Sequence, residues 1–127
     1  MTKTSITKIF NFEAAHNLPN HEGNCYNLHG HSYRLEIEVT GTRIKVGPAT
    51  GMILDFGDLK KIVKDYILDS HDHTCLNDLY DNPTAEVMIG FIHQTLSNAL
   101  WLKHKVHLVR VRLWETATSY AEIKEEC

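Results

Sequence analysis

The sequence has 127 residues, of which 43% are hydrophobic, and this length fits one ordinary domain spanning residues 1–127. Its 13 lysines and arginines and 16 aspartates and glutamates give a formal net charge of −3, and no segment is strongly basic, so we expect no nucleic-acid partner. No apolar run is long enough to span a bilayer and the N-terminus has no secretory signal, so we expect no membrane partner.

Two strands are predicted in the N-terminal third of the chain. The first runs from about Ile6 to His16, where alternate residues are apolar. The second runs from His29 to Thr40 and has the clearest alternation of apolar and polar residues in the sequence. His29 and His31 share its apolar face, at its N-terminal end.

Two helices are predicted after a turn-rich segment at residues 41–51. Asp55 is a suitable N-cap, so the first helix should begin there. A polar loop, residues 69–78, separates it from a second helix, which should begin at Pro83 because proline suits the first helical position. The expected apolar stripe of the first helix is Phe56, Leu59, Ile62, Val63, Tyr66 and Ile67. The second helix continues through Val87, Phe91, Leu96 and Ala99.

Two further strands are predicted at the C-terminal end. One places Val109, Val111 and Leu113 on one face, and Glu115 shares the parity of these apolar residues. Residues 120–124 form a short last strand. The order strand, strand, helix, helix, strand, strand predicts an α+β fold, with both helices on one face of an antiparallel sheet.

Three histidines form a candidate metal site. His29 and His31 are two residues apart on a strand, so both imidazoles can reach one ion. His16 ends the preceding strand and supplies a third nitrogen if the two strands pair. Three neutral ligands with an open fourth position are typical of catalytic zinc, although imidazole also suits iron, copper and nickel. The alternative is a set of core histidines that hydrogen-bond to the backbone.

Cys25 lies four residues before His29, and its role is left open by spacing alone. Near a divalent cation its thiol could act as a base or nucleophile. It could instead be a fourth ligand that closes the site, which would make the chain a non-enzymatic zinc-binding module, or a small apolar filler. Cys25, Cys75 and Cys127 form an odd set without a C-x-x-C pair, which indicates reduced thiols and a cytoplasmic location.

Two other positions are candidates for catalysis or binding. Asp72 and His73, which follow His71, could form an acid–base pair, although the pattern alone favours a solvated loop. Glu115 either faces inward, where a carboxylate can accept two adjacent N–H groups of a heterocycle, or already lies in water.

The chain resembles the 6-pyruvoyltetrahydropterin synthase family, and more narrowly the bacterial 6-carboxytetrahydropterin synthases of queuosine biosynthesis. The similarity runs nearly from end to end, and the C-x-x-x-H-G-H element is specific to it. F-x-A-A-H upstream and D-F-x-x-L-K downstream strengthen it. The matching segments are FNFEAAHNL, CYNLHGHSY, GMILDFGDLK, HDHTCLND, NPTAEV and WET.

The resemblance implies a role for each candidate residue. Zinc would be held by His16, His29 and His31, and Cys25 would be the catalytic thiol. Asp72 and His73 would form the second catalytic pair, and Glu115 would anchor the pterin. His71 stands where the family usually has leucine.

The resemblance also implies an assembly and a reaction. Family members share the tunnelling fold (T-fold), whose subunits form a β-barrel, usually as a hexamer of two trimers with active sites between subunits. The implied reaction converts 7,8-dihydroneopterin triphosphate to 6-carboxy-5,6,7,8-tetrahydropterin and releases triphosphate and acetaldehyde. In the alternative reaction triphosphate leaves but the carbon chain is kept, which gives 6-pyruvoyltetrahydropterin.

Overall fold

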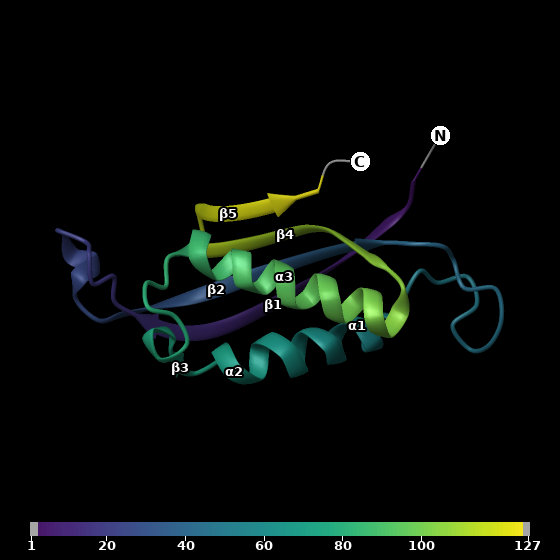
Figure 1. The fold of residues 1–127 in the computed structure, drawn as a ribbon, viewed down its shortest axis with the longest axis horizontal. Coiled ribbons are helices and arrows are strands. Elements are labelled where there is room, and N and C mark those ends of the chain that lie inside the picture. Colours follow the sequence, from purple (N-terminus) through teal and green to yellow (C-terminus); the bar gives the residue numbers. More distant parts are fainter. Residues whose placement is uncertain (1–2, 126–127) are drawn as a thin grey trace.

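A mostly antiparallel sheet forms one layer of the structure, a computed structural model that describes residues 3–125 (Figure 1). Its strands are β1 (Ser5–His16), β2 (His29–Thr40), β3 (Thr74–Cys75), β4 (His107–Thr116) and β5 (Ser119–Lys124). They lie in the order β3-β1-β2-β4-β5, and the short β3 pairs with β1 in parallel. The four long strands confirm the predicted ones. Cys127 lies outside the described residues.

Two helical segments form the second layer, across one face of the sheet (Figure 1). The first begins after Asp55, whose carboxylate accepts from the Gly57 amide at 2.7 Å, as predicted for its N-cap. No helix in the described part of the chain combines the length and hydropathy that crossing a bilayer requires. The segments comprise α1 (Phe56–Val63), which runs through a π-helical stretch (Lys64–Leu68) into α2 (Asp69–His71), and then α3 (Ala85–His104); 3₁₀ turns occupy Asn24–Tyr26 and Leu76–Asp78.

The core lies between the helical segments and the sheet face that they cover. Side chains of a strand alternate between the two faces of a sheet, so every second strand residue points inward. His16 continues the inward series of β1 and is only 1% exposed, so close packing reaches the end of that strand. The core includes Phe10, Phe12, Tyr33, Leu35, Ile37, Val111 and Leu113 from the sheet and Leu59, Ile62, Val63, Ile67, Met88, Ile92, Leu96 and Leu100 from the helices.

Two residues of the apolar stripe expected for the first helix lie largely outside the core. Phe56 and Tyr66 are 50% and 40% exposed, so placing them on the buried face is wrong. Val87 and Phe91 of the second helix are 46% and 49% exposed. The π-helical stretch explains part of the difference, because its wider turn changes which residues face the sheet.

The second helix begins later than predicted. The Thr84 hydroxyl accepts from the Val87 amide at 3.1 Å, so Thr84 is the N-cap and α3 begins at Ala85 rather than at Pro83. Pro83 therefore precedes the helix and leaves its carbonyl free to accept a hydrogen bond from elsewhere.

A β-bulge changes the predicted inward face of β4. Leu108 pairs with Val39 and Arg110 pairs with Glu38, so Val109 is an extra residue in the ladder. Leu108, which is 1% exposed, takes the core position that the alternation assigned to Val109.

The first part of the predicted solvated loop is ordered and buried. His71 ends the first helical segment and is 1% exposed. Its Nδ1–H donates to the Ile67 carbonyl at 2.8 Å, and the Tyr80 hydroxyl donates to its Nε2 at 2.7 Å. Burial lowers the pKa of His71 and raises that of Tyr80. A solvated position for His71 is therefore wrong.

The buried His71 predicts a pH-dependent stability. Because its pKa in the folded protein is lowered, the unfolded chain takes up this proton first as the pH falls. The stability that neutral His71 contributes is complete above the unfolded pKa of about 6.5 and is lost as the pH falls below it. We expect His71→Leu to show a smaller loss of unfolding free energy between about pH 7.5 and about pH 5 in urea titrations.

The control for this test is His21→Leu, which changes an exposed loop histidine and should keep the wild-type pH dependence. Equal pH dependence in the His71→Leu variant and the wild-type protein would contradict the assignment.

Candidate metal centre

Three imidazoles meet at the end of the β1–β2 pair. In the register of this pair, His16 lies opposite His29 and Ala14 lies opposite His31. Alternation then places the three histidine side chains on the helix-covered face. Nε2 of His16 is 3.1 Å from Nε2 of His29, and one possible ligand atom from each ring lies within 4.8 Å of the others. The predicted juxtaposition is confirmed.

Hydrogen bonds to backbone carbonyls fix the tautomers of two of these rings. Nδ1 of His16 lies 2.8 Å from the Pro83 carbonyl oxygen, and Nδ1 of His29 lies 2.7 Å from that of Asn27. A carbonyl oxygen only accepts, so both Nδ1 atoms carry the proton and both Nε2 atoms present lone pairs. These lone pairs face each other across 3.1 Å, an arrangement that a cation between them stabilises.

The geometry and chemistry of the cluster fit zinc. Two nitrogens on a tetrahedral zinc ion with bonds of about 2.0–2.1 Å are about 3.3 Å apart, close to the separation of the His16 and His29 nitrogens. Nε2 of His31 is buried and has no hydrogen-bond partner. Burial lowers the pKa of His31, against the opposing effect of the Glu115 carboxylate, and so favours the neutral ring that binds metals.

Groups around the cluster hold it in place. Tyr33 is fully buried, and its hydroxyl lies 3.4 Å from Nδ1 of His16. The side-chain amide of Asn77 accepts from the Asn17 amide and donates to its carbonyl, both at 2.9 Å, and so fixes the residue after His16. Sequence reasoning missed this support. In the sequence, Asn77 was noted only as part of a segment that matches the family. The role of Pro83 could not be predicted from its side chain, because its backbone carbonyl is the acceptor.

Glu115 faces the histidine cluster, as its parity predicted. Its Oε1 lies 3.8 Å from Nε2 of His31, and its side chain is 29% exposed. It lines a cavity of about 410 Å³ between the β4–β5 turn and the start of α3. A carboxylate here can accept two N–H groups of a ligand while the ligand's other end reaches the cluster. The other lining residues are Leu18, Thr84, Ala85, Glu86, Ser119, Tyr120 and Ala121.

Cys25 does not join the histidines within the chain. It lies in the 3₁₀ turn of the segment between β1 and β2, which projects beyond the end of the sheet (Figure 1). Among residues 3–125, the group of possible metal ligands at this site consists of the three histidines without the Cys25 thiol. A closed four-ligand site is therefore not formed in one chain, and Cys25 and Cys75 are free thiols.

Asp72 and His73 do meet, as an acid–base pair requires. Oδ1 of Asp72 lies 3.1 Å from Nδ1 of His73 and accepts from the Glu13 amide at 2.9 Å. The hydrogen bond from Glu13 is the main cause of the lowered pKa of Asp72. The His73 amide donates to the Glu13 carbonyl at 2.6 Å and holds His73 at a φ of 59°, a left-handed conformation that non-glycine residues rarely adopt.

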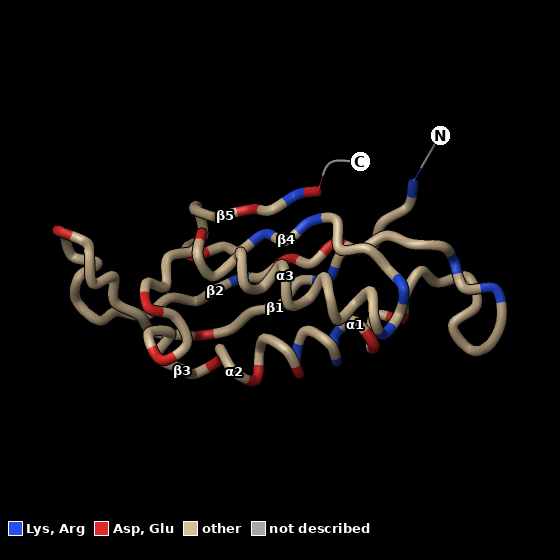
Figure 2. The backbone as a smooth tube through the Cα atoms, in the orientation of Figure 1, with Lys and Arg blue, Asp and Glu red and all other residues tan. Residues whose placement is uncertain are grey.

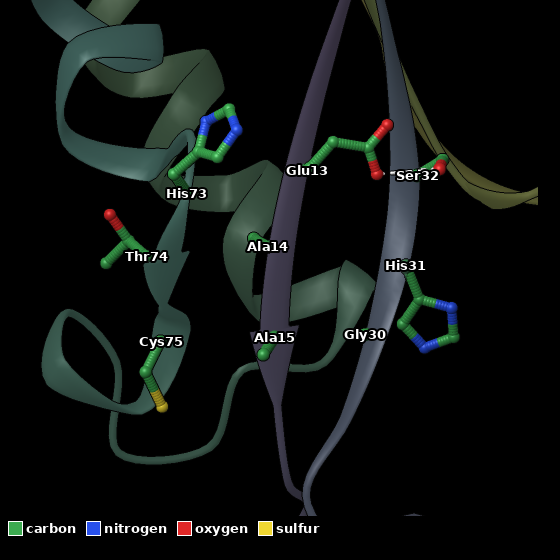
Figure 3. Close-up of a pocket in the computed structure, with 9 residues that line it drawn as sticks. All are labelled: Glu13, Ala14, Ala15, Gly30, His31, Ser32, His73, Thr74 and Cys75. Carbon is green, nitrogen blue, oxygen red and sulfur yellow. Dashed lines mark hydrogen bonds between the residues drawn. The ribbon is translucent and has the colours of Figure 1, made fainter.

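This pair is separated from the histidine cluster. His73 lines a surface cavity of about 540 Å³ beside β1 and β3, and the lining also includes Glu13, Cys75 and the His31 position of β2. Figure 3 shows the His73 ring on the β3 side of β1, whereas the His31 ring points away from it beyond β2. One chain therefore gathers three histidines and Glu115 at one place and the Asp72–His73 pair at another.

Comparisons with known proteins agree with these features. Residues 5–126 match the family described as 6-pyruvoyl tetrahydropterin synthase. A Haemophilus influenzae protein named 6-carboxy-5,6,7,8-tetrahydropterin synthase is 37% identical over 140 aligned residues, which cover 94% of this chain and 98% of the relative. A Synechocystis protein of the same name is 41% identical over 119 residues, which cover 91% of this chain and 89% of the relative.

The fold has a clear counterpart among solved structures. That of Caenorhabditis elegans 6-pyruvoyl tetrahydropterin synthase superposes with a TM-score of 0.79 at 24% identity, and the match covers 99% of this chain and 100% of that one. The expected α+β tunnelling fold of the subunit is confirmed. The chain therefore belongs to the 6-pyruvoyl tetrahydropterin synthase family.

Proposed function

We propose that this chain is a zinc-dependent 6-carboxy-5,6,7,8-tetrahydropterin synthase that acts in the cytoplasm, in queuosine biosynthesis. It would convert 7,8-dihydroneopterin triphosphate and one water to the carboxypterin, triphosphate and acetaldehyde. The observation that carries this proposal is the convergence of three imidazoles beside the Glu115 cavity. The names of the relatives from Haemophilus influenzae and Synechocystis support it.

Glu115 would orient the pterin. Its carboxylate can accept hydrogen bonds from the 2-amino group and the adjacent ring N–H, a pairing of one charged acceptor group with two donors. The carboxylate opens into a cavity of about 410 Å³ and lies 3.8 Å from His31. A pterin held there would extend its side chain toward the histidine cluster.

Zinc at His16, His29 and His31 would, when bound, act as a Lewis acid on the hydroxyl groups of the substrate's side chain. The Cys25 thiolate would remove a proton from that side chain. His73, whose Nδ1 lies 3.1 Å from the Asp72 carboxylate, would relay protons at the opposite face.

His73 rather than His71 is assigned the proton-transfer role. Both ring nitrogens of His71 are hydrogen-bonded to groups of the core, and its ring is buried. The His73 side chain is 80% exposed, so a substrate can reach it. His71 instead anchors the helical segment that leads into the pair.

The proposal includes an active site shared between copies of the chain. Cys25 and the Asp72–His73 pair lie apart from the histidine cluster in one subunit, so a second copy would have to supply the missing groups. We propose the barrel-forming hexamer of two trimers that the family resemblance implies.

A second reaction of the same substrate is a candidate because the matching family is described as 6-pyruvoyl tetrahydropterin synthase. In that case triphosphate is eliminated but the carbon side chain is kept, and no acetaldehyde is formed.

Product analysis tests the function and its metal dependence. We expect dihydroneopterin triphosphate to give 6-carboxytetrahydropterin and acetaldehyde, identified by mass spectrometry and an aldehyde assay. A chelator should lower turnover by about 100-fold or more, and added zinc should restore it, because metal activation is worth several kcal/mol.

The control pair for this test is His29→Ala, which should lose activity, and His104→Ala, a helix-surface change that should not. A pyruvoyl product without acetaldehyde would favour the second reaction. No turnover by the zinc-loaded protein would contradict both.

Replacement of Cys25 separates a catalytic thiol from a structural ligand. We expect Cys25→Ser to keep its zinc but to lose about 100-fold or more in kcat, the usual size of a lost proton-transfer group. The helix-surface change His104→Ala is again the control and should retain both zinc and activity. Loss of zinc from Cys25→Ser, measured by elemental analysis, would instead support the non-enzymatic closed site.

The same variant tests the shared site. Cys25→Ser and His29→Ala chains, each inactive alone, are dissociated and reassembled together. If one site takes Cys25 from one chain and its histidines from another, the mixture should regain activity. Mixtures that stay inactive, while reassembled wild-type protein recovers, would place both groups in one chain.

Glu115→Gln tests pterin anchoring. The amide keeps the shape but places a donor where two substrate donors need an acceptor, so we expect kcat/KM to fall by about 100-fold, or roughly 3 kcal/mol. Zinc content should be unchanged. Glu22→Gln, an exposed loop change at the same end of the molecule, should be neutral. Wild-type kcat/KM in Glu115→Gln would contradict the anchoring role.

A further inference from the structure

A basic cavity lies at the end of the sheet remote from the histidine cluster. It occupies about 730 Å³ where β1 and β4 begin and β2 ends. Figure 2 shows several lysines and arginines at this end of the molecule, with acidic residues at the start of α1 nearby. Among residues 3–125, no aspartate or glutamate lines the cavity, whose lining includes Lys3, Arg43, Trp101, Lys105 and His107.

Several cations elsewhere on the sheet and helices are paired with carboxylates. The Arg110 guanidinium lies 2.9 Å from Glu38, and that of Arg112 lies 2.8 Å from Glu122. These pairs neutralise the sheet face opposite the helices. In the basic cavity, neither Arg43 nor Lys105 has an ion pair with any of the residues that the structure describes.

One wall of the cavity is held in a fixed arrangement. The rings of Trp101 and His107 stack with centroids 4.8 Å apart, and the Lys105 ammonium lies 5.2 Å from the centroid of the Trp101 ring. Lys105 ends α3 in a left-handed conformation, and its amide donates to the Trp101 carbonyl at 3.0 Å. These contacts hold Lys105 beside the cavity, where its charge can face a ligand.

The other wall adds the group best suited to phosphate. Arg43 projects from the exposed segment that follows β2, and its guanidinium can form two parallel hydrogen bonds to phosphate oxygens. Thr42 adds a hydroxyl donor beside it. The volume lies in the range of ordinary small-molecule sites, so the cavity can hold an anion larger than a single carboxylate.

We propose that this cavity binds a phosphoanion with several charges, of the class of inorganic triphosphate. Arg43 and Lys105 converge on a cavity with no described carboxylate in its lining, and such a site matches a compact polyanion better than a neutral ligand. The inference depends on charge and geometry at this end of the sheet, and it holds whether or not the proposed reaction is correct.

Calorimetric titration with inorganic triphosphate tests the site. The titration uses the His29→Ala chain, because triphosphate could otherwise bind through a metal at the histidine cluster. We expect about one triphosphate per chain, with affinity that falls as salt is raised. Adding Arg43→Gln or Lys105→Gln should weaken binding roughly tenfold, as for loss of a charged hydrogen bond.

Lys45→Gln is the matched control, because Lys45 is exposed in the same segment as Arg43 but does not line the cavity. It should change affinity less than about twofold. Absence of binding, or equal weakening by all three changes, would overturn the proposal. The substituted side chains are exposed, and thermal unfolding checks that each variant folds.

Steady-state kinetics on the zinc-loaded protein distinguish two sources of the anion. If the cavity holds the phosphate tail of the substrate, Arg43→Gln will raise KM for dihydroneopterin triphosphate roughly tenfold. If it holds a separate phosphoanion, KM will be unchanged while triphosphate binding is still lost. Both outcomes support the site, and failure of the proposed reaction would leave the calorimetric result intact.

Discussion

The antiparallel register of β1 and β2 is the constraint on which the candidate site depends. It sets His16 opposite His29 and places His31 one step further along the same face. A slip of one residue would turn His29 and His31 to the opposite face of the sheet, away from His16. The buried pairs between Phe12 and Tyr33 and between Phe10 and Leu35 oppose such a slip, so the packing of the core fixes the metal centre.

The rest of the fold supplies the groups that orient these rings. The Pro83 carbonyl, just before α3, accepts a hydrogen bond from His16. It is available because Thr84, rather than Pro83, is the N-cap of the helix. Asn77 fixes the residue that follows His16. Metal binding and folding should be coupled, because the converging lone pairs repel each other unless a cation lies between them. The basic cavity lies at the opposite end of the sheet, away from the histidines.

The alternation of apolar and polar residues predicted the strands and those site residues whose side-chain direction a strand sets. The bounds of β2, the inward face of β1 and the inward turn of Glu115 all follow from a period of two. The bulge at Val109 and the exposure of Phe91 could not be predicted, because they depend on how neighbouring elements pack. Likewise, Cys25 has the spacing of a site residue but lies outside the ligand group, since its position depends on a loop and, in our proposal, on a second copy.

X-ray absorption spectroscopy at the zinc edge tests the central claim most directly. For the zinc-loaded protein, three imidazole nitrogens and one further light-atom ligand should appear at about 2.0–2.1 Å, and the imidazole scattering should weaken in His16→Ala. A sulfur ligand at about 2.3 Å would show that a cysteine closes the site. Failure to bind zinc, or a spectrum unchanged by His16→Ala, would contradict the three-histidine centre.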